Sequence, residues 1–333
     1  MNYLEIYQYS DLIASILGLV LNVVLLIGLF KTNKNGFHAY SYLLLVPCAN
    51  DIFFSTYQLL VQHLIKVDGG IIYIFPLGFE KYVPQKYLCI TAFLHLFSIT
   101  NTFTTQPAIY HYRYVIVSKI GSGPTVSVLV RNLIISVIAA LAVGMAFGAS
   151  IHQTIYWGRD YYIQKLSPLW FDENGQTAFM YAANWADKST KAYFVIVIIV
   201  FSAANMLSMY FIWISVKSVH AETSSVSETT KQLRAQFTKT LISQTIVLTF
   251  FALIPCTIYM MALMFQTGGE FLGIIVLGPV SWFSCLNGLL PMYFVRAIRV
   301  FVLGLLGIKT RGPKSIQSTV EKSNVTSSNL DVA

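Results

Sequence analysis

Charged residues are scarce in this chain of 333 residues: Asp, Glu, Lys and Arg make up only 11% of it, whereas 56% is hydrophobic. A soluble domain carries about 25% charged residues, because polar groups must cover its surface. The mean hydropathy of +0.63 points the same way. The composition therefore excludes an ordinary soluble protein and predicts one whose surface largely faces lipid.

Cysteines and catalytic motifs are also lacking. The four cysteines, Cys48, Cys89, Cys256 and Cys285, lie in or beside apolar runs, and none belongs to a CxxC pair or a Cys/His cluster with metal-ligand spacing. HExxH, GxSxG, Walker and GxGxxG patterns are missing, and no apolar run contains the acid pair of an intramembrane protease. We therefore expect no cofactor, no metal and no enzymatic activity.

Long apolar runs are what the chain does contain. A bilayer core about 30 Å thick requires roughly 20 apolar residues per helix. Such runs predict seven spans, near 12–30, 42–64, 87–111, 132–151, 192–216, 240–265 and 271–295. The expected fold is an all-α bundle of seven transmembrane helices. We expect a short terminal segment (1–11) before it, and an interfacial helix (296–308) and a disordered tail (309–333) after it.

The basic residues predict the orientation of the bundle. With the amino terminus outside, the cytoplasmic segments carry about twice as many lysines and arginines as the external segments, which is the usual bias. The net charge of +8 lies in these short loops rather than on one face. We therefore expect a membrane partner and no nucleic-acid partner.

One external stretch, 152–191, is longer than the other external loops and contains Trp157, Trp170 and Trp185. Two interpretations remain open from the sequence. The stretch folds over the mouth of the bundle, or its aromatic residues form a belt at the membrane interface.

Three polar residues lie at comparable depths inside predicted spans: Asn22 in the first, Asp51 in the second and Asn287 in the seventh. Asp51 is the only ionisable residue that we place within a span core, and such a residue is costly to bury unless it is paired. We predict a hydrogen-bonded cluster of the three, with Ser284 and Asn50 nearby. It serves either as interhelical contact or as a conformational switch.

The outer halves of the spans supply candidates for a ligand pocket. His95 lies about two turns inside the third span, and later spans supply Tyr193, Tyr259, Met260 and Trp282. Aromatic and methionine side chains suit a small apolar ligand, although they are also ordinary constituents of membrane helices. The last span has no lysine, which excludes a retinal Schiff base.

The inner end of the third span carries the sequence YHYRY, with Arg113 between Tyr112 and Tyr114. Arg113 is either an interface anchor or the cytoplasmic working end of a signalling helix. The motif resembles the Asp/Glu-Arg-Tyr motif of rhodopsin-like G-protein-coupled receptors, with Tyr112 in place of the acid. Asn22 and Asp51 match polar positions of that class, whereas LNGLLPMYFV separates Asn287 and Pro291, which are adjacent in the Asn-Pro-x-x-Tyr motif.

The order of several segments resembles the nematode serpentine chemoreceptors of the Str superfamily, of the Srd or Srh type. The segments are KTNKNGFHAYSYLLL, YRY, LISQTIVLTFFALIP and PMYFVRAIR, and the likeness covers about residues 12 to 305. The resemblance implies that a small, odorant-like ligand binds in the outer half of the bundle. It also implies coupling to a heterotrimeric G protein, at the plasma membrane of a sensory cilium.

Two basic segments on the cytoplasmic side are candidates for the contact with the G protein. KQLRAQFTKTL (231–241), which contains Arg234, continues the sixth span inward, and RAIRVFVLGLLGI (296–308) begins with Arg296. The alternative is simple anchoring by positive charge. In the second segment we expect Ile298, Phe301, Val302 and Leu305 to lie in lipid.

Two other functional classes fit a chain with seven spans. A ligand-gated cation channel of the insect odorant-receptor type has its amino terminus inside and requires acids along a pore, and neither matches this sequence. A small-solute transporter commonly shows internal repeats, and none is visible here. A receptor is the preferred hypothesis.

Overall fold

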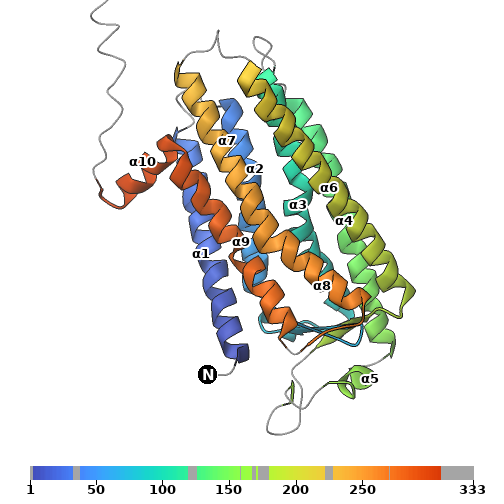
Figure 1. Ribbon diagram of the computed structural model, residues 1–333. Coiled ribbons are helices and arrows are strands. Elements are labelled where there is room, and N and C mark those ends of the chain that lie inside the picture. Colours follow the sequence, from blue (N-terminus) through green and yellow to red (C-terminus); the bar gives the residue numbers. More distant parts are fainter. Residues whose placement is uncertain are drawn as a thin grey trace, which may run out of the picture.

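In the computed structural model, the chain forms a bundle of long helices that a small β-sheet closes at one end (Figure 1). The structure describes residues 3–32, 38–118, 126–157, 159–166, 170–171, 180–221, 228–269 and 271–308. Within these residues, seven helices are long and apolar enough to cross a membrane. The end that carries the sheet and the first helix's amino terminus is called the outer end below, and the opposite end is called the inner end.

The seven spans fall on the seven predicted apolar runs, which confirms the predicted fold class. They are α1 (Tyr3–Thr32), α2 (His38–Val61), α3 (Leu88–Ser118), α4 (Val126–Trp157), α6 (Lys188–Ala221), a sixth span that consists of α7 (Glu228–Leu248), η5 (Thr249–Leu253) and α8 (Ile254–Met264), and α9 (Leu272–Phe294). Most helices extend beyond the apolar runs. The helix α1 already begins at Tyr3, so most of the predicted terminal segment 1–11 is helical. The predicted tail 309–333 lies outside the described residues.

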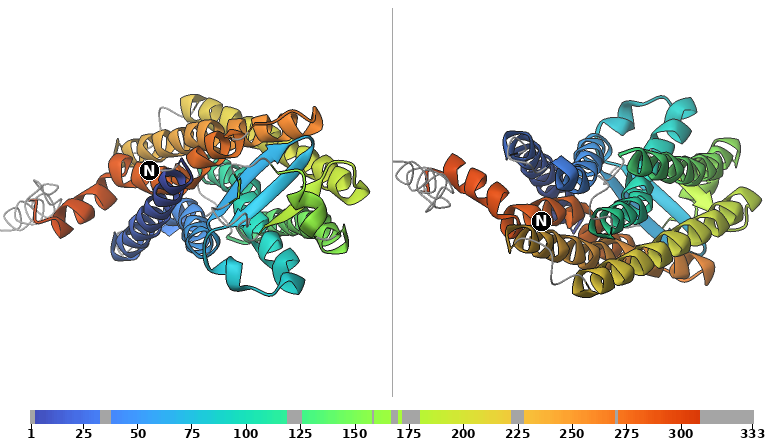
Figure 2. Two further views of the ribbon diagram at one scale, coloured as in Figure 1. Left: turned by 90° about the horizontal axis from the view of Figure 1, so that it is seen from below. Right: turned by 90° about the horizontal axis from the view of Figure 1, so that it is seen from above.

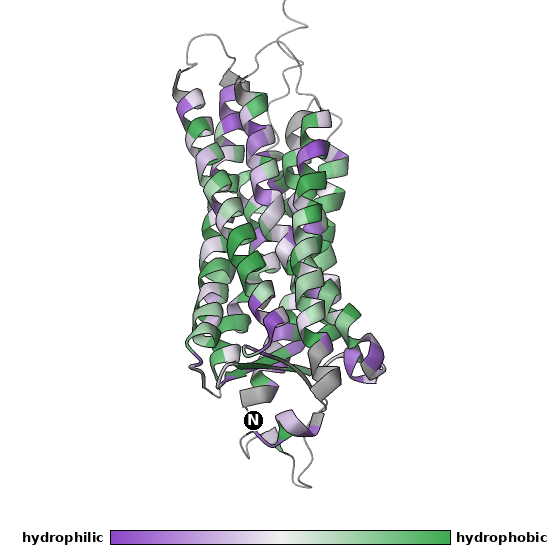
Figure 3. Ribbon diagram, turned by 90° about the vertical axis from the view of Figure 1, so that its right-hand side faces the viewer, coloured by the Kyte–Doolittle hydropathy of each residue, from purple (hydrophilic) through white to green (hydrophobic). Residues whose placement is uncertain are grey.

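The outside of the bundle is apolar over most of its length, as Figure 3 shows. Large aliphatic side chains such as Ile135, Ile199 and Ile275 are more than half exposed. In water this exposure would be unfavourable by about 25 cal/mol per Å² of apolar surface, whereas hydrocarbon removes that cost. The exposed apolar surface therefore fits a helix bundle that is surrounded by lipid.

A three-stranded antiparallel sheet crosses the outer end of the bundle (Figure 2). It contains β1 (His63–Asp68), β2 (Ile71–Pro76) and β3 (Tyr181–Asn184), in the order β1-β2-β3. Gly69 and Gly70 connect the first two strands with φ angles of +53° and +79°, which glycine adopts without steric cost. This turn fixes the register of the hairpin, with Asp68 opposite Ile71.

Both faces of the sheet are covered, which explains why the central strand β2 is apolar throughout. Ile72 and Ile74 of β2 pack toward the helices, whereas Tyr73 and Phe75 pack against the outer loop. Trp170 of that loop stacks on Phe75 with ring centroids 4.4 Å apart. Of the two interpretations for 152–191, the described part of this loop follows the first: it folds over the mouth of the bundle.

Gly273, in the first turn of α9, allows the sheet to lie directly on this helix. A Cβ atom at this position would lie 1.5 Å from the backbone oxygen of Ile65 in β1. Any larger residue would therefore push the strand away from α9. The sheet and the seventh span are in this way fixed to each other.

The sixth span is interrupted near its middle. The turn η5 is π-helical, and Pro255 follows it at the start of α8. A π-turn leaves the regular hydrogen-bond ladder, and proline lacks the N–H that would continue it. The outer segment α8 packs on α9 and β1, whereas the fifth span, α6, packs mainly on α3 and α4. A seam therefore remains between α6 and α8.

The helix α10 (Arg296–Leu305) turns away from the bundle after α9 (Figure 1). Its apolar face is divided between protein and surroundings. Leu305 is exposed, but Ile298 is fully buried against Leu25 and Leu29 of α1. The expectation that Ile298 lies in lipid was therefore wrong, because the beginning of α10 packs against the inner end of α1.

Candidate functional site

A cavity of about 70 Å³ lies in the outer half of the bundle, directly beneath the sheet. Ile74 of β2 lies on its outer side, and α3, α6, α8 and α9 surround it. Four of the residues predicted for a ligand pocket line it: His95, Tyr193, Tyr259 and Met260. A cavity needs about 10–15 Å³ to hold a single water, so this one has room for more than one water-sized group.

Trp282, the fifth predicted pocket residue, does not line this cavity. Its indole Nε1 donates a hydrogen bond to the hydroxyl of Ser10 in α1, at 3.1 Å. Trp282 therefore faces the junction of α9 and α1. The cavity is instead lined on the α9 side by Val276 and Leu277.

Two tyrosine hydroxyls are the free polar groups of the cavity. Within the described part of the chain, neither Tyr193 nor Tyr259 has a hydrogen-bond partner for its hydroxyl. The thiol of Cys256 lies on the same wall, and the remaining lining is almost entirely apolar. The cavity therefore offers two hydrogen-bond donors in an apolar enclosure, which matches a small apolar molecule that carries a hydrogen-bond acceptor.

The two histidines that line the cavity, His63 and His95, already form hydrogen bonds within a group of polar residues that we call the outer polar network. Its members are Asp11, Gln58, His63, Glu80, His95 and Tyr181.

Glu80, in the short helix η2 (Phe79–Tyr82), is the acceptor at one end of the outer polar network. It is buried and accepts hydrogen bonds from the hydroxyls of Thr91 and, at 3.2 Å, of Tyr181. His63 Nε2 forms a buried hydrogen bond with the other carboxylate oxygen. Burial, together with the Glu80 carboxylate, raises the pKa of Tyr181 well above its ordinary value, so this hydroxyl keeps its proton at neutral pH.

The proton positions follow from the other end of the outer polar network. The Gln58 carbonyl can only accept, so His95 Nε2 donates to it at 2.7 Å. A neutral His95 then accepts at Nδ1, and His63 Nδ1, at 2.5 Å, is the donor. His63 therefore bridges His95 and Glu80 through its two ring nitrogens.

Asp11 corrects the expectation that Asp51 is the only ionisable residue within a span. It lies in α1 inside the span Glu5–Thr32 and is 1% exposed. Its Oδ1 accepts hydrogen bonds from Gln58 Nε2 at 2.8 Å and from the Ser281 hydroxyl at 2.5 Å. The outer polar network therefore joins α1 and α9 to the sheet. Asp11 was missed because the apolar run was taken to begin at residue 12.

A second polar cluster lies deeper in the bundle. Asn287 Nδ2 donates to the carboxylate of Asp51. Asn22 Nδ2 donates to the backbone oxygens of Ser284, at 3.0 Å, and of Gly18, at 2.9 Å. The structure thus brings the three predicted residues into one region between α1, α2 and α9, although Asn22 is bonded to backbone rather than to the other two side chains.

Asn50 does not join this deeper cluster. Its side chain bonds to Thr105 at 2.8 Å and to Asn101 at 2.9 Å, both in α3. Adjacent residues of a helix point in directions about 100° apart, so Asn50 and Asp51 contact different neighbours.

At the inner end of α3, the Arg113 side chain is buried and its Nη2 donates to the Thr238 hydroxyl of α7. One turn earlier, the Tyr110 hydroxyl contacts Thr245 and the backbone oxygen of Leu241, both in α7. The third and sixth spans are therefore joined at the level where Tyr112 replaces the usual acid. Arg113 has no carboxylate next to it in the sequence, and its side chain instead donates a hydrogen bond to Thr238.

The residues that flank Arg113 have different environments. Tyr112 is fully buried among apolar side chains, including Leu43 and Leu129, and its hydroxyl has no hydrogen-bond partner among the described residues. Tyr114 is only partly buried. Tyr112 thus contributes packing, while Arg113 reaches α7.

The two other predicted coupling residues also lie at the inner end. Arg234 is largely buried in α7, where its backbone oxygen accepts a hydrogen bond from Thr238 at 2.6 Å. Arg296 is exposed, and its backbone N–H donates to the side chain of Gln236 in α7 at 3.1 Å. Only Arg296 therefore presents its side chain outward.

This arrangement of seven spans, an outer cavity and a buried arginine at the inner end of the third span is that of a bundle of G-protein-coupled-receptor type. Residues 7–303 match the model of the family described as "Serpentine type 7TM GPCR chemoreceptor Str". The chain therefore belongs to the Str family of serpentine chemoreceptors. This match does not indicate the Srd or the Srh type that the sequence suggested.

The fold is similar to that of squid rhodopsin. The crystal structure of squid rhodopsin matches with a TM-score of 0.62 and 10% sequence identity, covering 91% of this chain and 86% of that chain. At this low identity the likeness concerns the fold alone. Among curated proteins, none matches the sequence.

Proposed function

We propose that this membrane protein is a chemoreceptor that binds a small molecule in the cavity beneath the sheet and activates a heterotrimeric G protein at its inner end. One observation carries the proposal: a largely apolar cavity lined by Tyr193 and Tyr259, whose hydroxyls have no hydrogen-bond partner among the described residues. A hydrogen bond from such a hydroxyl to a ligand acceptor contributes about 0.5–1.5 kcal/mol. The ligand is therefore a small molecule with an acceptor such as a carbonyl or ether oxygen.

The cavity and the inner end are connected through the same spans. The third span supplies His95 at the cavity and Arg113 at the inner end, and the sixth supplies Tyr259 and Thr238. A ligand shifts an equilibrium only if it binds one packing better than the other. We propose that ligand contact with α8 changes the sixth span about η5 and releases Arg113 from Thr238, which exposes the G-protein site.

In this proposal the polar cluster at Asp51 is part of the conformational switch. The surroundings of Arg234 and Arg296 contact the G protein. We place the receptor in the plasma membrane, in a sensory cilium, and propose that its physiological stimuli are odorant-like molecules. Membership of the Str chemoreceptor family supports the proposed location and stimuli. The small volume of the cavity favours ligands of few heavy atoms.

The test is a cAMP or calcium reporter assay against a panel of small ketones, esters, alcohols and acids. The chain is expressed with and without a promiscuous Gα subunit. A response that requires Gα supports the proposal. A current or calcium signal that is independent of any G protein would overturn it in favour of a ligand-gated channel.

Arg113→Ala tests the inner end in the same cells. We expect near-normal surface expression and loss of G-protein activation, because the buried arginine connects the third span with the sixth. Arg131→Ala is the matched control, since Arg131 is an exposed arginine near the inner end of α4. Unchanged signalling by Arg113→Ala would contradict the role assigned to this residue.

A further inference from the structure

We propose that ligands enter the cavity sideways from the outer leaflet of the membrane, through a groove between α6 and α8. The inference rests on the proposed function, because it takes the cavity to be the ligand site. It adds the route of entry and the class of molecule that can use that route, namely uncharged lipophilic molecules of few heavy atoms.

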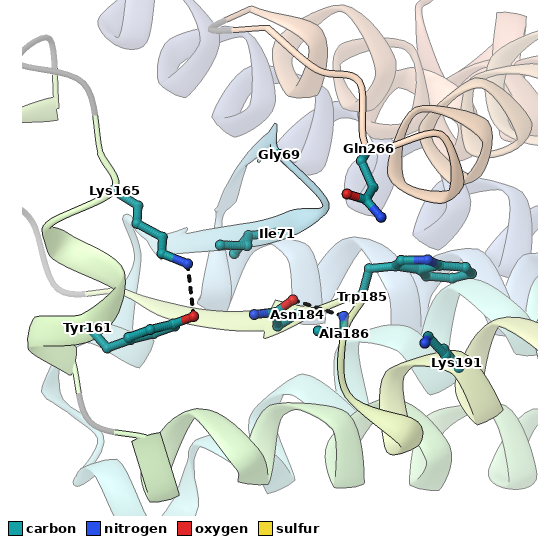
Figure 4. A pocket seen from close by; sticks show the side chains of 9 residues that line it. All are labelled: Gly69, Ile71, Tyr161, Lys165, Asn184, Trp185, Ala186, Lys191 and Gln266. Atoms are coloured by element: carbon teal, nitrogen blue, oxygen red, sulfur yellow. Dashed lines mark hydrogen bonds between the residues drawn. The ribbon is translucent and has the colours of Figure 1, made fainter.

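The route from water is closed by the sheet. On the water-facing side, a basin of about 470 Å³ is lined by polar residues such as Lys165, Asn184 and Lys191 (Figure 4). In this view the Lys165 ammonium group donates to the Tyr161 hydroxyl, at 2.8 Å. Among the residues that the structure describes, none lines both this basin and the cavity. A polar molecule that settles in the basin is therefore still separated from Tyr193 and Tyr259.

The groove offers a second approach. It has a volume of about 490 Å³ and lies in the seam between α6 and α8. Met206, Met261 and Met264 line it and are substantially exposed to the lipid side. Trp185 lines both the basin and the groove, so the groove begins at the outer end of the bundle, at the level of the outer leaflet.

Only one layer of side chains separates the groove from the cavity. Phe201, Cys256 and Met260 line both spaces. Phe201 is held by stacking on Phe103, with centroids 4.5 Å apart, whereas methionine is unbranched and adapts its shape readily. Met260 is therefore the movable part of the wall.

The position of the wall in the sixth span allows it to open. Cys256 and Met260 lie in α8, directly after η5 and Pro255, where the backbone ladder is interrupted. Because α8 packs on α9 and β1 rather than closely on α6, a small rotation of α8 widens the seam without breaking a tight helix contact. Apolar molecules accumulate in the hydrocarbon at this level, whereas a charged group there is strongly disfavoured.

The native thiol of Cys256 makes the route measurable. Membranes that contain the full chain are treated from outside with neutral N-ethylmaleimide or with permanently charged trimethylammonioethyl methanethiosulfonate. Modification of each cysteine is followed over time by mass spectrometry. We expect the neutral reagent to modify Cys256 and the charged reagent to spare it. Cys89, which is partly exposed at the outer end of α3, is the internal control for the charged reagent.

A matched pair of variants in α8 tests the groove itself. Met261 and Ile258 are apolar and similarly exposed, at 45% and 48%, but only Met261 lines the groove. Met261→Trp should slow modification of Cys256 by the neutral reagent about tenfold, equivalent to about 1.4 kcal/mol in the barrier. Ile258→Trp should leave the rate unchanged.

Two results would overturn the inference: equal rates for the two variants, or modification of Cys256 by the charged reagent as fast as that of Cys89. Any panel compound that activates the chain supplies a second readout. For such a compound, Met261→Trp should slow the onset and the decay of the response by the same factor, because a route alters rates and not affinity. If no compound activates the chain, the proposed function fails, while the cysteine rates still show whether the groove is reached from the membrane.

Discussion

At the scale of single residues, each end of the bundle buries a charged group, and the two groups have different kinds of partner. A buried charged group requires partners. At the outer end Glu80 is surrounded by His63, Thr91 and Tyr181, and at the inner end Arg113 is held by a neutral hydroxyl. The outer contact involves a histidine and two hydroxyls, whereas the inner contact includes a charge-assisted hydrogen bond from Arg113 to Thr238.

Thr238→Val should raise ligand-independent G-protein activation, because it removes the oxygen that accepts from Arg113. Losing about 1 kcal/mol of resting-state stability changes the ratio of states roughly fivefold. Thr240→Val is the control, since within the described residues the Thr240 hydroxyl bonds to the backbone oxygen of Gln236 in its own helix and to no other helix. Basal reporter activity normalised to surface expression is the measurement. Equal basal activity of the two variants would show that Thr238 does not restrain Arg113.

Asp51→Asn should alter basal or evoked signalling more than it alters folding. The amide retains the size of the carboxylate and can still accept from Asn287, so the contact that it weakens is worth about 0.6–2 kcal/mol at most. Surface expression should stay close to that of the wild type, while the dose–response curve shifts. A loss of surface protein with normal signalling per receptor would show that the cluster is purely structural.

At the scale of elements, the sheet is the part of the molecule that departs most from the sequence expectations. The turn sequence Asp68-Gly69-Gly70-Ile71 is a known hairpin pattern, and the flanking apolar residues could have identified β1 and β2. The pairing of β2 with β3 could not be inferred in this way, because it joins two loops that are distant in the sequence. Burial on both faces also removes the alternation of polar and apolar residues that marks most strands.

Gly273→Ala should destabilise the outer end, because the added methyl group would occupy the space of the Ile65 backbone oxygen. Overpacking of this kind costs about 1–3 kcal/mol. Gly278→Ala, in the same helix, is the control, since a Cβ there meets nothing within 4 Å. The melting temperature of the detergent-solubilised protein distinguishes them. Equal stability of the two variants would mean that β1 does not rest on α9.

At the scale of the whole molecule, the seven spans could be predicted because each is an apolar run long enough to cross a bilayer. The deeper polar cluster could be anticipated from the similar depths of Asn22, Asp51 and Asn287. The partner of Arg113 could not, since nothing in the pattern around Thr238 distinguishes it from the other threonines of α7. Its role depends on how the third and sixth spans pack. The cavity could not be predicted either, because the sheet, which was not expected from the sequence, covers its outer side.

The stability of the whole receptor should be insensitive to reducing agents. All four cysteines are free, so β-sheet pairing and the outer polar network, rather than a disulfide bond, hold the loops to the third span. Dithiothreitol should leave the melting temperature and the ligand response unchanged. A clear fall in melting temperature on reduction would reveal a disulfide bond and contradict this account of the outer end.

The sheet has a consequence for chimaeric receptors. Tyr181 contacts Glu80 and His63 across 101 and 118 residues of sequence. The first and second external loops therefore form one transplantable unit. Moving either loop alone into a related receptor would separate β2 from β3 and remove the Tyr181 hydroxyl from Glu80 and His63, whereas moving both together preserves these contacts. Domain exchanges intended to transfer ligand preference should accordingly carry residues 63–82 and 181–184 as a set.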